Sequence, residues 1–212
     1  IPKVLHSSID MLTLQRIDSQ AATANQMSTL GRGLAHLHNV TQTYYGNDED
    51  NYIGQNLQAN GRDESWGNFF VERRLRFQVN LVKNSAVKKH FLKTLNTHSN
   101  ALKDYLDKHC EKSSIVHGDL WSGNVLFDKE RVWLIDPAVY WADREVDLAM
   151  TELFGGFSHQ FYEAYDAASP RSQYYMIKRT IYNLYHYLNH YNLFGDTYLP
   201  ACKSGFEHIR KL

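Results

Sequence analysis

The sequence predicts an α+β protein that is mostly helical and carries a few short β-hairpins. Over several long stretches, apolar residues recur every three or four positions, which is the spacing of amphipathic helices. Short apolar runs separated by polar turns occur at the start of the chain and again within 115–138, where they indicate strands. An apolar content of 43% in 212 residues is enough for a sizeable core.

In the first third of the chain, the pattern predicts a hairpin, a helix and a long loop. Residues 1–18 contain two β-prone runs, IPKVL and MLTLQRI, with Ser7-Ser8 expected in the turn between them. A helix is indicated by Met27, Leu30, Leu34 and Leu37. Residues 44–65 are rich in Asn, Asp and Gly and lack a clear period, so we interpret them as a loop. Loops of about twenty residues in compact domains are often functional.

The remainder predicts helices around a small group of strands. An aromatic helix face is indicated by Trp66, Phe69, Phe70 and Phe77, and an amphipathic helix by Val87, Phe91, Leu95, His98, Leu102 and Leu106. Short strands are expected at Ile115-Val116, VLFD and VWLID, the last two joined by a turn at Lys129-Glu130. Three more helices are expected: DLAMTELF ending at Gly155-Gly156, HQFYEAYDAA, and 173–191 with Met176, Thr180, Leu184, Leu188 and Tyr191 on one side.

Composition excludes several classes of function. Lys+Arg and Asp+Glu both total 23 and no basic run occurs, which argues against non-specific nucleic-acid binding. No apolar run approaches the ~18–20 residues that span a bilayer, and residues 1–10 lack a signal core, so no membrane partner is expected. Cys110 and Cys202 are far apart and form no C-x-x-C pair, which fits a cytoplasmic protein. The lack of an H-x-x-x-H cluster disfavours a zinc hydrolase.

Three polar residues stand on loops beside the predicted strands. Asp119 and Asn124 have the D-x-x-x-x-N spacing of a kinase catalytic loop, and Asp136 follows the next pair of strands. Phosphoryl transfer needs an aligned acceptor hydroxyl and divalent cations on the phosphates. Asp119 can accept the proton of that hydroxyl, while Asn124 and Asp136 offer the hard oxygen ligands that Mg²⁺ prefers. The hairpin between these two places both at the same end of the strands.

The same spacing has an ordinary structural interpretation. Asp119 could cap a turn and Asn124 could occupy a tight bend. The preceding His117-Gly118, the flanking strands and the following Asp136 favour the catalytic interpretation.

Four longer segments resemble the fructosamine-3-kinase (ketosamine kinase) family: HGDLWSGN, IDPAVYWADREVDLAMTELFGGF, IYNLYHYLNHYNLFGDTY and DNYIGQNLQANGRDESWGNFFVERRL. The resemblance implies a protein-kinase-like fold, near the aminoglycoside and choline phosphotransferases. It implies that ATP and Mg²⁺ serve to phosphorylate the 3-hydroxyl of a ketosamine, on a free or protein-linked amine. The product then decomposes and the sugar leaves the amine.

The resemblance also implies roles for individual residues. Asp119 corresponds to the catalytic base, and Asn124 and Asp136 correspond to the metal ligands. His117 is expected to support the catalytic loop, and Asp147 to hydrogen-bond its backbone from beneath. The backbone of Leu14, Gln15, Arg16 and Ile17 is expected to meet the adenine of ATP, although an ordinary strand end is the alternative.

The substrate side of the resemblance is less regular. Asp50, Asn51, Asn60 and Trp121 are the expected substrate residues, with a polar surface loop as the alternative for the first three. Gly61-Arg62 follows Asn60 where the family often has a tryptophan. Trp121 and Trp141 could face a sugar ring or pack in the core. We interpret Tyr182, Tyr185, His186 and His190, on the last predicted helix, as packing residues.

The chain shows neither a glycine-rich phosphate loop nor a strand lysine before this site. Gly31-Arg32-Gly33 lies inside a helical pattern. We therefore expect 1–18 to be a remnant of the N-terminal lobe and hinge, and 19–212 to be the helical C-terminal catalytic lobe. Most of the small β lobe is then missing from the sequence, and this stretch alone should bind ATP poorly. A related aminoglycoside or choline kinase and a non-catalytic pseudokinase are the alternatives. The preferred ketosamine and the oligomeric state stay open.

Overall fold

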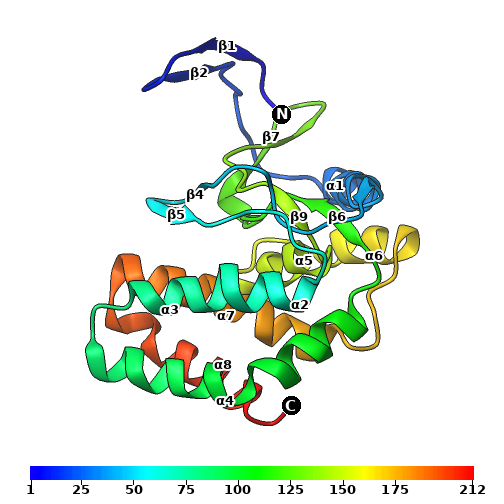
Figure 1. Cartoon of the computed structure of the whole chain (residues 1–212). Helices are drawn as coiled ribbons and strands as arrows, with labels where there is room; N and C mark the ends of the chain where they lie inside the picture. Colours follow the sequence, from blue (N-terminus) through cyan, green and yellow to red (C-terminus); the bar gives the residue numbers. More distant parts are fainter.

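The computed structural model describes residues 1–212, with a β-hairpin at one end, a middle layer of strands and helices, and a helical layer at the other end (Figure 1). The hairpin pairs β1 (Val4–Ser7) with β2 (Leu12–Leu14) in antiparallel register. This confirms the first predicted hairpin. Its turn lies at residues 8–11, not at Ser7-Ser8, because Ser7 pairs with Leu12.

Two small sheets carry the polar segment. A three-stranded antiparallel sheet has the order β3 (Thr41–Gln42), β6 (Ser113–Val116), β9 (Tyr140–Ala142). A hairpin pairs β7 (Val125–Phe127) with β8 (Val132–Leu134), as predicted. The strands β3 and β9 were not predicted, because two or three residues are too few to show alternation.

The prediction of a loop over 44–65 is wrong in its centre. Residues there form an antiparallel hairpin of β4 (Asn51–Ile53) and β5 (Asn56–Gln58). Gly54 has φ +59° in the two-residue turn, a conformation that glycine adopts without steric cost. The strands are mostly polar, so the sequence pattern did not indicate them.

A smaller core lies in the middle layer. Helix α1 (Ala24–Leu37) begins at a capping box formed by Thr23 and Gln26 and packs against α6 (His159–Ala168). This core includes Leu120, directly after Asp119, so the packing of the two helices supports the loop 117–124, called the Asp119 loop below.

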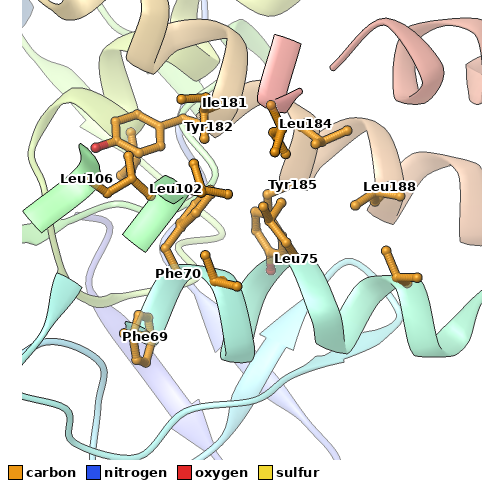
Figure 2. Close-up of a cluster of buried hydrophobic side chains, with 14 of the residues drawn as sticks. Phe69, Phe70, Leu75, Leu102, Leu106, Ile181, Tyr182, Leu184, Tyr185 and Leu188 are labelled. Carbon is orange, nitrogen blue, oxygen red and sulfur yellow. The ribbon is translucent and has the colours of Figure 1, made fainter. Parts of the chain in front are cut away.

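The larger core lies in the helical layer. The labelled residues in Figure 2 come from α2 (Trp66–Phe69), the π-helix η1 (Phe70–Arg76), α4 (Ser85–His109) and α7 (Tyr175–Phe194). Their side chains meet between these helices, except that of Phe69, which points to the other side of its helix and stacks on Tyr140. Helix α5 (Glu145–Leu153) borders it from the middle layer. The helical layer also contains α3 (Phe77–Leu81) and α8 (Leu199–Ile209).

The predicted helices are confirmed with two differences in which face they bury. Phe77 is only partly buried, because the π-helical turn before it delays the helical repeat. Met176 is 60% exposed, and α7 buries Lys178, Ile181 and Tyr185 instead. The helix α8 was not predicted. None of the helices is long and apolar enough to cross a membrane.

Candidate functional site

The Asp119 loop begins where β6 ends, directly after Val116. Gly118 has φ +82°, and a Cβ added there would lie 2.1 Å from the carbonyl oxygen of Ala138. The amide of Ala138 donates to the carbonyl of His117 at 2.8 Å. The loop therefore turns against the segment after Asp136, and only glycine fits between them.

We expect Gly118→Ala to destabilise the fold by about 1–3 kcal/mol and to displace Asp119. Gly195→Ala is the matched control, because Gly195 has φ +83° with nothing within 4 Å of its added Cβ. The control measures the backbone strain alone. Equal losses of melting temperature in the two variants would show that the contact with Ala138 is unimportant.

The Asp147 carboxylate accepts two hydrogen bonds from the backbone of this loop. Its Oδ2 accepts from the His117 amide at 2.7 Å and its Oδ1 from the Gly118 amide at 2.8 Å. His38 Nε2 lies 3.1 Å from Oδ2, and His38 Nδ1 lies 2.7 Å from the Tyr165 hydroxyl. Burial opposes the charge of Asp147, but these hydrogen bonds outweigh it and hold its pKa below the usual value. His38 and Tyr165 were missed, because helical residues facing a distant loop leave no local motif.

His117 supports the loop with its ring. Its Nδ1 accepts from the Asp119 amide at 3.3 Å, so its Nε2 carries the proton donated to the Ile135 carbonyl at 2.9 Å. Burial lowers the pKa of His117, which keeps the ring in this neutral form. His117 therefore ties Asp119 to Ile135, the residue directly after β8.

The structure brings Asp119, Asn124 and Asp136 together. Asn124 Nδ2 lies 2.9 Å from the Asp119 carbonyl, 3.3 Å from the Asp119 carboxylate and 3.5 Å from the Asp136 carbonyl. Asp136 is the one residue other than glycine with positive φ, at +48°. Such backbone strain persists only where the surroundings impose it, and it clusters at functional sites.

Burial also tunes Asp119. Removal from water, together with the charges of Asp147 and Asp136, raises its pKa to about 6, although the hydrogen bond from Asn124 acts in the opposite direction. A carboxylate with such a pKa is ionised at neutral pH and still accepts a proton readily. The electrostatics therefore suit a general base.

The residues present fit a hard divalent cation. Asn124 uses only its Nδ2 in hydrogen bonds, which leaves its Oδ1 unpaired, and the carboxylate of Asp136 is exposed and makes no hydrogen bond or ion pair. No three His, Cys, Asp or Glu side chains form a metal site. A cation here would thus take one amide and one carboxylate oxygen, and complete its shell with phosphate oxygens and water, as Mg²⁺ does.

A pocket of about 360 Å³ opens beside Asp119. Its walls come from the β4–β5 hairpin, the Asp119 loop, α5 and the end of α7, and Asp119 is its only charged group. Trp121, Phe154, His190, Phe194 and Tyr198 give it aromatic sides. His190 Nδ1 is buried beneath the lining and makes no hydrogen bond. The pocket can therefore hold a small polar molecule against aromatic faces, with a base at its end.

Only Trp121 of the four expected substrate residues lines this pocket. The Asp50 carboxylate accepts from the Asn60 amide at 2.6 Å, and Asn51 Oδ1 accepts from Asn60 Nδ2 at 3.0 Å. Asn60 is buried, with 3% of its surface exposed. The structure thus places these three in a hydrogen-bond network at the base of the β4–β5 hairpin, and none of them lines the pocket.

Several residues that line the pocket were interpreted differently from the sequence or were missed. His190 was interpreted as a packing residue, but it lines the pocket. Phe154, Phe194 and Tyr198 were missed, and their one sequence signal is that they lie in the LFGGF and NLFGDTY segments that carry the resemblance. Trp141 lies on β9 against Tyr44 and does not line the pocket.

The segment Leu14–Ile17 leaves the first hairpin and runs toward β7. The amide of Gln15 donates to the Lys3 carbonyl, and the amide of Gln20 to the Phe127 carbonyl, both at 2.8 Å. Between them, residues 16–19 make no backbone hydrogen bond. Their amides and carbonyls are therefore available to a ligand.

Comparison with known proteins agrees with this geometry. The model of the fructosamine kinase family matches residues 3–211. The chain belongs to this family. A protein named probable ketoamine kinase in Vibrio parahaemolyticus is 44% identical over 180 residues, covering 84% of this chain and 62% of that protein. The chloroplastic protein-ribulosamine 3-kinase of Arabidopsis thaliana is 35% identical over 196 residues, covering 91% and 60%. The chain thus spans less than two thirds of the length of either relative.

Solved structures show the same fold. A protein of Thermobifida fusca assigned as a fructosamine-3-kinase superposes with a TM-score of 0.86 at 26% identity, covering 100% of this chain and 74% of that one. The choline kinase LicA of Streptococcus pneumoniae gives 0.66 at 14% identity, covering 100% and 75%, and so shows the fold alone. The predicted protein-kinase-like fold of this fructosamine kinase family member is confirmed.

Proposed function

We propose that the complete protein carrying this chain uses ATP and Mg²⁺ to phosphorylate the 3-hydroxyl of ketosamines. The position of Asp119 carries this proposal. Its carboxylate meets the Asn124 amide on one side and lines the pocket of aromatic residues on the other. A base at the junction of a cation site and an acceptor pocket suits transfer of a phosphoryl group between them.

Each residue then has one part in the reaction. The backbone at Leu14–Ile17 would meet adenine, and Asn124 and Asp136 would hold a Mg²⁺ that neutralises charge on the phosphates. Asp119 accepts the proton of the sugar hydroxyl while the oxygen of that hydroxyl forms a bond to the γ-phosphorus. The bond from that phosphorus to the β,γ-bridging oxygen breaks, and ADP leaves.

The lining of the pocket suits a ketosamine better than an aminoglycoside. Aromatic faces suit the sugar ring. An aminoglycoside carries several ammonium groups, but Asp119 is the single carboxylate in the pocket. Both free and protein-linked ketosamines remain acceptors under this proposal, as the name of the Arabidopsis relative suggests. The free thiols of Cys110 and Cys202 suit the reducing cytoplasm, where we place the activity.

Transfer of labelled γ-phosphate tests the proposal. The complete protein is incubated with labelled ATP, with and without Mg²⁺, and with fructosyl-lysine, ribulosyl-lysine, choline or kanamycin as acceptor. We expect label on the two ketosamines only, at the 3-hydroxyl by NMR, and only with Mg²⁺. Preferred labelling of choline or kanamycin would favour the related small-molecule kinase, and no transfer to any acceptor would favour a pseudokinase.

The raised pKa of Asp119 predicts a pH dependence of this activity. The base works only when ionised, so kcat/KM should fall as the pH drops through about 6, tenfold per unit below it. An ordinary aspartate would place this fall near pH 4. A profile that stays flat between pH 7 and 5 would contradict the buried environment assigned to Asp119.

A further inference from the structure

Arg74 is a fully buried cation without an acidic partner. It lies in the π-helix η1, is 0% exposed, and forms no salt bridge. Its Nη1 donates to the Ala59 carbonyl at 2.5 Å and its Nη2 to Asn60 Oδ1 at 2.9 Å. The rings of Tyr140 and Phe69 cover its guanidinium carbon at 4.1 and 4.6 Å.

This arrangement is costly for the fold. A buried charge without a counterion loses its hydration, and carbonyl oxygens and aromatic faces replace that hydration only in part. The Nε of Arg74 is buried with no hydrogen-bond partner at all. The π-helix around it is a rare conformation that occurs often at functional sites. The costly burial and the rare helix geometry together indicate that the contacts of Arg74 have a function.

A chain of hydrogen bonds connects Arg74 to the segment after Asp136. Arg74 holds Asn60, and Asn60 donates to Asn51 Oδ1. Asn51 Nδ2 in turn donates to the Val139 carbonyl at 2.9 Å, and Gln58 Nε2 donates to the Ala138 carbonyl at 3.1 Å. The β4–β5 hairpin is thereby joined through side-chain amides to the backbone that carries Asp136 and that packs on Gly118.

The hairpin that Arg74 holds also lines the acceptor pocket. Ile53 and Gly54, at the tip of the same hairpin, line the pocket beside Asp119. Asn56 Nδ2 donates to Asn189 Oδ1 at 2.8 Å, and Asn189 lines the pocket from α7. The hairpin is therefore a wall of the pocket. The backbone of 51–58 makes no hydrogen bond to the backbone of another element, so its side chains fix where that wall stands.

We propose that Arg74 is a positioning residue, which fixes the β4–β5 hairpin as a wall of the acceptor pocket by holding Ala59 and Asn60. The inference rests on the proposed function for the identity of the acceptor. The guanidinium of Arg74 is planar and bonds two acceptors at once in a fixed geometry, whereas the ammonium of lysine is a point donor on a flexible stem. Displacing the hairpin by a fraction of an ångström would misplace the acceptor hydroxyl relative to Asp119.

The test compares Arg74→Lys with Arg73→Lys in the complete protein. Arg73 is the exposed neighbour on the same π-helix and its side chain makes no hydrogen bond, so it is the matched control. We expect Arg74→Lys to raise the KM for fructosyl-lysine by about tenfold and the KM for ATP by less than about twofold. Arg73→Lys should change neither. A lower melting temperature with both KM values unchanged would show a purely structural role and overturn the proposal.

Two further measurements keep the inference separate from the proposed function. Asn51→Ala cuts the link to Val139 without touching Arg74, and it should raise the acceptor KM in the same way if Arg74→Lys fails to fold. Hydrogen exchange of the amides in 51–58 needs no activity, and it should quicken in Arg74→Lys but not in Arg73→Lys. Unchanged exchange overturns the positioning role, whereas failure of the wild-type protein to phosphorylate any ketosamine overturns the proposed function alone.

Discussion

Replacing Asp119 with asparagine is expected to lower kcat for ATP-dependent phosphorylation of fructosyl-lysine by about 10²–10⁴-fold. The amide has the shape of the carboxylate but accepts no proton, so the loss measures general-base catalysis and not packing. The hydrogen bond from Asn124 Nδ2 is lost as well if the new amide presents its own NH₂ group there. Steady-state kinetics of the complete protein at saturating ATP and acceptor measures the effect.

Asp104→Asn is the control for this substitution, because Asp104 is exposed on α4 and makes no hydrogen bond or ion pair. It should leave kcat unchanged. Because the raised pKa of Asp119 disfavours its charge in the folded state, Asp119→Asn should not destabilise the fold at neutral pH. Near-normal turnover by Asp119→Asn would reject Asp119 as the base.

Asp147→Asn is expected to destabilise the fold by about 3–5 kcal/mol at neutral pH. The two oxygens of Asp147 accept from the amides of His117 and Gly118, and His38 contacts one of them. An asparagine must turn its NH₂ group toward one of these donors, which leaves a buried amide unpaired. In a chain of this size the loss corresponds to a fall in melting temperature on the order of 10 °C.

The effect should depend on pH in a defined direction. The pKa of Asp147 is lowered in the folded state, so its contribution is complete above the unfolded pKa near 3.8 and is lost as the pH falls below it. The difference between wild type and Asp147→Asn should therefore shrink in acid. Asp166→Asn is the control, because Asp166 pairs with Arg171 while a third of its side chain is exposed, and should cost about 1 kcal/mol or less. Equal costs for the two variants would contradict the assigned role of Asp147.

The sequence predicted those parts of the site that are close together along the chain. His117, Asp119 and Asn124 lie within eight residues, and Asp136 follows one hairpin later, so spacing and strand pattern were enough to bring them together. The long periodic helices were likewise predictable, because their apolar spacing extends over many turns.

What the sequence could not predict depends on contacts between distant segments. His38 reaches Asp147 across 109 positions, and Asn56 reaches Asn189 across 133, without any local motif. The hairpin β4–β5 was missed because its strands are short and polar, and their amide side chains bond to other elements in place of packing in a core. The sequence linked the substrate side with Asp50, Asn51 and Asn60. In the structure this link is indirect, because their hydrogen-bond network supports the hairpin that forms the pocket wall and does not itself line the pocket.

The convergence of Asp119, Asn124 and Asp136 on one metal–nucleotide is tested most directly by Mn²⁺ binding. Electron paramagnetic resonance measures the affinity of the complete protein for Mn²⁺ in the presence of a non-hydrolysable ATP analogue. We predict that Asp136→Asn and Asn124→Ala each weaken this affinity by at least about tenfold, and that Asp119→Asn changes it far less. Mn²⁺ affinity that is unaltered by changes at positions 124 and 136 would contradict the account.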